Sequence, residues 1–138
     1  MARLLALTTL LVLPAVAQAA MMIRIAVVEG APSVEVRAEG LRIRPLTDDG
    51  FYDPVPGGAV LLRREGEAIA WGAGESAPVV KLRADGPIAV GPTVVRGAVE
   101  VLPDARGLLV VNELPMETYL AAVLGSEMPP SFEPDALK

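Results

Sequence analysis

Turn residues interrupt the sequence every few positions between Met22 and about Asn112. Short runs rich in Val, Ile and Leu alternate there with Gly, with Pro and with acid-Gly pairs. Runs of this length and composition, bounded by such residues, are typical of β-strands joined by turns. At 138 residues the chain is long enough for one small domain. The sequence therefore predicts a single strand-rich body.

Two stretches of this body resemble each other. In Ser33–Pro45 and in Val79–Pro92 an alternating run enters Arg-Ala, passes through Glu-Gly or Asp-Gly, and leaves in a second run. Such pairs suit a two-residue hairpin turn, because Gly adopts positive φ without strain. We predict two β-hairpins with Arg37 and Arg83 in equivalent places. The similarity fits either an internal repeat or two copies of a common hairpin pattern.

Two further hairpins are expected. Ala59–Gly72 has strand-like runs that meet near Glu65-Gly66, and Val94–Leu114 ends in the return run Leu108–Val111. That return run is apolar at every position, which indicates a strand buried on both faces.

The segment Leu46–Gly58 is a predicted loop by its Asp, Pro and Gly content. Its aromatic residues Phe51 and Tyr52 have two interpretations: they stack on a sugar, or they pack back onto their own sheet. Trp71 has the same two interpretations, and its place at the end of a predicted strand favours the core.

A helix is predicted after the last hairpin. Pro115 suits the first helical position, and an apolar face at helical spacing follows, made of Met116, Leu120, Val123 and Leu124. Gly125 then fits the helix stop. A second helix is expected to start within Glu133–Lys138. One turn has little reason to form alone, so we expect the sequence to be the front part of a longer protein.

Residues 1–19 have the layout of a secretory signal peptide. One basic residue, Arg3, precedes an apolar run, and the segment ends in Ala17-Gln18-Ala19. The alternative is an uncleaved anchor, which would be the protein's contact with a membrane. We favour cleavage after Ala19, which leaves residues 20–138 outside the cytoplasm, in the periplasm or the cell wall.

Charge and composition narrow the possible functions. The formal net charge is −5, so the basic surface that nucleic acids require is not expected. The sequence has no Cys and no His, which excludes disulfides, His-based triads, Cys nucleophiles and the usual zinc sites from this stretch of chain. We expect no metal and no cofactor. Carboxylates, hydroxyls, Lys and Arg remain for chemistry.

Five carboxylates gather near the end of the sequence. Four of them flank the two predicted helix starts, where acids complement the helix dipole: Glu113, Glu117, Glu133 and Asp135. Glu127 instead falls in the predicted connection between the helices, followed by Met128 and two prolines. It is either an ordinary exposed acid or, because the prolines stiffen the connection, a side chain aimed into a groove.

These residues carry a resemblance to a known family. RGAVEV (Arg96–Val101) followed by LLVVNELPMETYLAAVLGSEMPPSFEPDALK (Leu108–Lys138) closely resembles the signature of the SpoIID/LytB family, which comprises stage II sporulation protein D and the amidase enhancers. The resemblance is strong over about residues 94–138 and diffuse over 22–93. It implies an α+β protein whose β-hairpin-rich N-terminal part is followed by helices that carry the signature. In the family the final Ala-Leu-Lys continues into a further helix, so residues 20–138 would be an incomplete domain.

The resemblance also implies an activity. Family members with demonstrated activity are peptidoglycan lytic transglycosylases that cut glycan strands lacking stem peptides, and their catalytic acid occupies the position of Glu127. The substrate's own 6-hydroxyl replaces water as the nucleophile, so a single carboxylate suffices. The pKa of this acid would have to be raised by burial against apolar groups such as Met128 and Phe132. Substrate-binding residues are not identified by these motifs, and a chain ending at Lys138 is expected to be inactive alone.

Two other functions stay open. Some family members enhance a cell-wall amidase, so the chain could bind glycan or that enzyme without cutting anything. It could also be a plain extracytoplasmic β-scaffold, which would not bind peptidoglycan. The sequence does not establish a link to sporulation itself.

Overall fold

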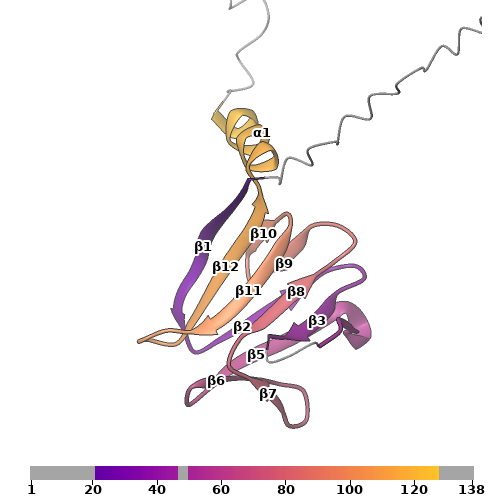
Figure 1. The fold of residues 1–138 in the computed structure, drawn as a ribbon, viewed down its shortest axis with the longest axis vertical. Coiled ribbons are helices and arrows are strands. Elements are labelled where there is room, and N and C mark those ends of the chain that lie inside the picture. Colours follow the sequence, from indigo (N-terminus) through magenta and orange to yellow (C-terminus); the bar gives the residue numbers. More distant parts are fainter. Residues whose placement is uncertain (1–20, 47–49, 128–138) are drawn as a thin grey trace, which may run out of the picture.

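The computed structural model describes residues 21–46 and 50–127, with side chains described as far as Gly125 (Figure 1). It consists of two antiparallel β-sheets packed on each other and one C-terminal α-helix. The strand-rich body is therefore confirmed. The second helix expected within Glu133–Lys138 and the signal segment 1–19 lie outside the described residues.

Sheet A has six strands and carries both the first and the last strand of the body. Its order is β1 (Met22–Ala31), β12 (Leu108–Pro115), β11 (Ala98–Pro103), β8 (Val80–Arg83), β3 (Arg42–Pro45) and β4 (Asp53–Pro54).

Sheet B also has six strands. Its order is β10 (Thr93–Val95), β9 (Ile88–Val90), β2 (Ser33–Arg37), β5 (Ala59–Glu65), β6 (Ala68–Trp71) and β7 (Glu75–Ala77).

One apolar core fills the space between the sheets. Alternate residues of each strand point into it, as the two-residue period of a strand requires. Its largest fully buried side chains are Leu41, Leu62, Ile69, Leu82, Ile88 and Leu108. Trp71 is 9% exposed and belongs to the same cluster, so the core interpretation of this residue is confirmed.

The two similar stretches are not hairpins, contrary to the prediction. After Glu39-Gly40 the chain leaves sheet B for sheet A, and after Asp85-Gly86 it leaves sheet A for sheet B. A type I′ hairpin turn needs positive φ at both central residues. Here only Gly40 has it, at +65°. Each strand pairs instead with a strand of the other stretch, β3 with β8 and β2 with β9.

This exchange gives the sheets matching strand orders. Reading across sheet A gives β12-β11-β8-β3-β4, and reading across sheet B gives β6-β5-β2-β9-β10. The third strand of each series is β8 in sheet A and β2 in sheet B. The chain crosses from β8 to β9, the fourth strand of the sheet B series, and from β2 to β3, the fourth strand of the sheet A series. The Asp85 amide donates a 3.1 Å hydrogen bond to the Glu39 carbonyl where the two turns meet. The matching orders favour an internal repeat over chance similarity.

The hairpin predicted over Ala59–Gly72 is confirmed, and the one predicted over Val94–Leu114 is confirmed from Ala98 on, because Val94 and Val95 belong to β10 of sheet B. β5 pairs with β6 around Gly66, whose φ is +61°, and β11 pairs with β12. In the return strand, Leu108 and Val110 are fully buried and Val111 nearly so, whereas Leu109 is only half-buried.

The predicted loop contains the short strand β4 and a 3-10 turn, η1 (Pro56–Gly58). Phe51 does not pack onto the sheet, since 86% of it is exposed. Tyr52 is half-buried, and the guanidinium groups of Arg44 and Arg83 lie 5.9 Å and 5.4 Å from its ring centroid.

Helix α1 (Met116–Glu127) differs from the prediction at both ends. Pro115 is the last residue of β12, where it lies opposite Met22, and is not the first helical residue. The helix then continues through Gly125 and includes Glu127, because a glycine inside a helix costs only about 1 kcal/mol. The predicted connector position of Glu127 was therefore wrong.

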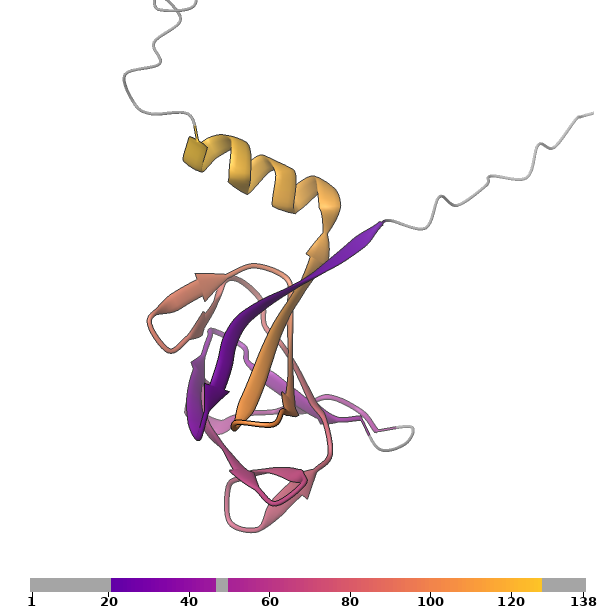
Figure 2. The same ribbon diagram turned by 90° about the vertical axis from the view of Figure 1, so that its left-hand side faces the viewer.

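The helix extends away from the two sheets (Figure 2). Its base is fixed where the Met116 amide donates a 2.8 Å hydrogen bond to the Met21 carbonyl. The expected apolar face is largely uncovered, with Leu120 48% and Leu124 59% exposed. No helix within residues 21–46 and 50–127 is long and apolar enough to cross a bilayer.

Candidate functional site

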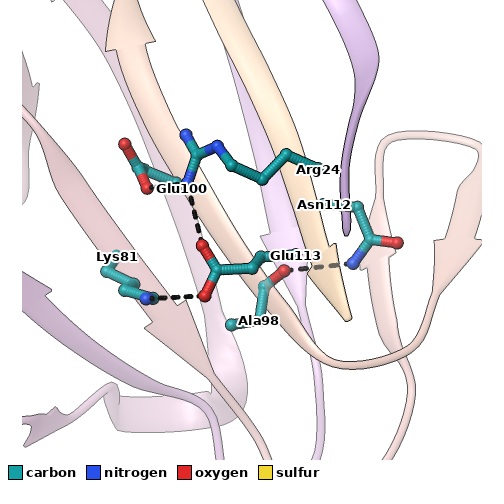
Figure 3. Close-up of polar contacts among 6 residues, drawn as sticks. All are labelled: Arg24, Lys81, Ala98, Glu100, Asn112 and Glu113. Carbon is teal, nitrogen blue, oxygen red and sulfur yellow. Dashed lines mark hydrogen bonds and ion pairs between the residues drawn. The ribbon is translucent and has the colours of Figure 1, made fainter. Parts of the chain in front are cut away.

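The longer part of the signature, Leu108–Lys138, starts in strand β12. The alternation of this strand sends consecutive residues to opposite faces of sheet A. Asn112 points inward and is 5% exposed. Its side-chain amide donates hydrogen bonds to the carbonyl oxygens of Arg96 (2.6 Å) and Ala98 (3.0 Å), as Figure 3 shows for Ala98. A buried amide is stabilising only when it is paired in this way. Asn112 therefore fixes the start of β11 against β12.

Glu113 points to the outer face and lies between two cations (Figure 3). Its carboxylate contacts Lys81 Nζ at 3.2 Å and Arg24 Nη1 at 2.8 Å, and Arg24 also contacts Glu100 at 2.9 Å. Burial acts to raise the pKa of Glu113, but Lys81 and Arg24 together hold this pKa below its ordinary value. Glu113 is thus a strand residue held ionised by ion pairs, and its predicted role at a helix start was wrong.

Glu117 lies in the first turn of α1, as predicted. An acid there complements the positive end of the helix dipole. Together with Arg96 and Thr118 it lines a shallow depression beside the helix.

Glu127, the predicted catalytic residue, is the last residue of α1. Its backbone continues the helix away from the sheets, and its side chain lies outside the described part of the structure. Met128, Phe132, Glu133 and Asp135 also lie outside the described residues.

A cleft of about 500 Å³ opens at the base of the helix. It lies between the end of β12 and the turn from β8 to β9. Its lining combines charged side chains with apolar ones, namely Arg42, Arg83, Asp85, Arg96 and Glu113 with Met22, Pro87 and Pro115. These arginines were not predicted as site residues. For Arg42 and Arg83 the sequence contained a signal. In Arg42–Arg44 and in Lys81–Arg83 two cations flank one apolar residue, which places the cations on the outward face of a strand whose apolar residue is buried.

Metal binding has no support in the described residues. Within 21–46 and 50–127, no group of three Asp or Glu side chains is arranged to hold a metal ion.

Comparison with known proteins gives one match. Residues 104–138 match the family model of SpoIID, described as stage II sporulation protein. The matched segment begins at the turn between β11 and β12 and includes all of β12 and α1. No curated protein and no solved structure was found to match the chain. The sequence-based recognition is therefore confirmed over this segment.

Proposed function

We propose that this chain, which carries the SpoIID family signature over residues 104–138, acts on peptidoglycan as part of an exported lytic transglycosylase. The family match supports a sporulation- or cell-wall-related role, and the substrate and the reaction are our proposal. The observation that carries it is the position of Glu127 inside the matched segment, in its Ser-Glu-Met-Pro element.

The proposed reaction uses Glu127 twice. Its carboxylic acid first protonates the glycosidic oxygen, and the bond from that oxygen to the anomeric carbon of N-acetylmuramic acid breaks. The 6-hydroxyl of the same sugar then attacks the anomeric carbon, and the Glu127 carboxylate accepts the hydroxyl proton. The acid is regenerated and the product has a 1,6-anhydro end. No water and no second carboxylate take part, unlike in most glycosidases.

Two acids of the described body are unsuited to the proton-donor role. Lys81 and Arg24 hold Glu113 ionised, as described above. The Asp104 carboxylate accepts hydrogen bonds from the amides of Arg106 (2.7 Å) and Gly107 (2.8 Å), and these bonds lower the pKa of Asp104. A general acid needs the opposite shift, towards the working pH.

The test is a comparison of glycan products. The complete protein, its Glu127→Gln variant and its Glu67→Gln variant are incubated with glycan strands freed of stem peptides. Glu67 is a matched control because its side chain is 96% exposed in the β5–β6 turn. We expect mass spectrometry to show 1,6-anhydro ends with wild type and Glu67→Gln, and at least a hundredfold fewer with Glu127→Gln. Equal product from all three proteins would refute the assignment.

A second function, non-catalytic binding of glycan or of a cell-wall amidase, is favoured by one observation. The described lining of the cleft at the base of α1 comes from the β-body and includes three arginines, Arg42, Arg83 and Arg96, which suit an acidic ligand. If Glu127→Gln keeps full sacculus binding and full amidase stimulation while no anhydro ends form even with wild type, the binding function replaces the enzymatic one.

Export is the part of the proposal that concerns residues 1–19. Cleavage after Ala19 would give a mature protein that begins at Ala20 and lies outside the cytoplasm. N-terminal sequencing of the protein recovered from the periplasm or the culture medium tests this directly, and an intact Met1 would indicate an anchored form.

A further inference from the structure

Four cations lie side by side on the outer face of sheet A. They come from the neighbouring strands β3 and β8, and we call them the cationic strip: Arg42, Arg44, Lys81 and Arg83. In the strand register Arg42 lies opposite Arg83, and Arg44 opposite Lys81. Like charges placed directly opposite each other on a sheet repel and lower its stability.

Two of these cations have carboxylate partners. Lys81 contacts Glu113, and both side chains are largely buried. Arg42 contacts Asp85 at 3.2 Å, but the two side chains are 45% and 66% exposed. Exposed pairs of this kind are weak and are screened by salt, so the Arg42 guanidinium can exchange Asp85 for another carboxylate.

The other two cations have no carboxylate partner within the described residues. The guanidinium groups of Arg44 and Arg83 lie 5.9 Å and 5.4 Å from the centroid of the Tyr52 ring. The Arg44 Nε is buried and makes no hydrogen bond with any described residue. Arg83 is exposed at the edge of the cleft. Although the chain has a net charge of −5, the described residues of this face carry an excess of positive charge.

The cleft at the base of α1 brings part of this charge next to apolar surface. Arg42 and Arg83 line it from one side, and Arg96 lines it from the loop before β11. Met22 and Pro115 supply apolar contacts beside them. The cleft also contains two carboxylates: Asp85, which pairs with Arg42, and Glu113, which pairs with Lys81 and Arg24. Arg83 and Arg96 form no ion pair with either of these described carboxylates. Guanidinium groups next to apolar surface suit a ligand that combines a sugar ring with a carboxylate, because the fork of N–H donors matches the two carboxylate oxygens.

We propose that this cleft binds the free lactyl carboxylate of N-acetylmuramic acid, with Arg83 as its principal partner and Arg42 and Arg96 beside it. This rests on the proposed function and adds the basis of its substrate preference. In a peptide-bearing strand the lactyl carboxyl group is consumed in an amide bond and is neutral. Removing the stem peptide restores one negative charge on each muramic acid. Arginines in the cleft thereby distinguish the two kinds of strand.

The test measures binding rather than cleavage. The full chain is titrated by calorimetry with a tetrasaccharide of alternating N-acetylglucosamine and N-acetylmuramic acid. A second titration uses the same tetrasaccharide with each lactyl carboxyl group converted to its methylamide, which is neutral and almost the same size. We expect the free acid to bind about tenfold tighter at low salt, as one charge-assisted bidentate pair provides.

Variants identify the residue responsible. Arg83→Gln should remove the tenfold preference, and Arg83→Lys, which keeps the charge, should retain part of it. Arg37→Gln is the matched control, because Arg37 occupies the equivalent place before the other sheet-crossing turn, on sheet B. It should leave the preference intact. Circular dichroism verifies that each variant is folded, and Arg83→Lys preserves the test if Arg83→Gln is not.

Three results would overturn the proposal. These are equal binding of the free acid and the methylamide, the same loss of preference in Arg37→Gln as in Arg83→Gln, and displacement of the tetrasaccharide by an equal concentration of inorganic phosphate, which would reveal general anion binding. The catalytic proposal fails separately: if Glu127→Gln forms anhydro ends at the wild-type rate while the free acid is still preferred, the cleft assignment stands without it.

Discussion

Glu113 illustrates how the surroundings of a side chain determine its role. By sequence it is one of several acids near a predicted helix start. In the structure it is the shared partner of Lys81 and Arg24 on the outer face of sheet A. The sequence could not reveal this, because Arg24, Lys81 and Glu113 meet only through the pairing of β1, β12, β11 and β8.

Glu113→Gln should lower the free energy of unfolding by about 1–3 kcal/mol, since it leaves the largely buried Lys81 ammonium without a charged partner. Urea unfolding followed by circular dichroism measures this. Glu29→Gln, at an exposed position of β1, is the control and should change stability by less than about 0.5 kcal/mol. A Glu113→Gln protein as stable as the control would show that the ion pairs contribute nothing net.

The same pair of proteins should respond differently to acid. The pKa of Glu113 is lowered in the folded protein, so its stabilising effect is complete above the ordinary value of 4.5 and is lost as the pH falls through the lowered pKa. The stability difference between wild type and Glu113→Gln should therefore be constant near pH 6–7 and shrink below about pH 4.5. A difference that grows on acidification would contradict the direction of the pKa shift.

At the scale of elements, short-range patterns predicted the strands well and their partners less well. The β5–β6 and β11–β12 hairpins follow from local turn signals. The two sheet-crossing turns have the same local signal as a hairpin turn. They cross between the sheets because β3 pairs with β8 and β9 pairs with β2, and these partners are far away in sequence. Helix α1 was predicted, but its continuation through Gly125 was not, because one glycine only weakens a helix.

A substitution at Gly97, just before β11, tests how closely the backbone of β12 packs against this position. Its φ is +87°, and an added Cβ would lie 2.4 Å from the Glu113 carbonyl oxygen. Gly57 has a similar φ of +74° with nothing within 4 Å. Gly57→Ala should therefore cost only the backbone strain, about 1–2 kcal/mol. We expect thermal unfolding to show a clearly larger loss for Gly97→Ala, and equal losses would mean that the strands separate easily at this point.

In the whole molecule the predicted catalytic residue and the cationic strip lie in different elements, α1 and the strands β3 and β8. The helix that contains Glu127, the predicted catalytic residue, extends from the body (Figure 1). The cationic strip lies on the outer face of sheet A. The composition shows that the chain is acidic, but a net charge of −5 does not reveal that the cationic strip gathers positive charge on one face. The family signature, by contrast, was legible from sequence because it is a long ordered motif, and residues 104–138 match the SpoIID model.

The pairing of β1 with β12 has a consequence for the order of folding. Met22 lies opposite Pro115, so the first strand of the body to be made needs the last one as its neighbour. During synthesis or translocation from the N-terminus, β1 has no strand partner until β12 emerges, because β12 is its only neighbour in the described sheet. An unpaired strand is prone to association with other chains. Newly made protein is thus most vulnerable to aggregation just before its signature segment appears.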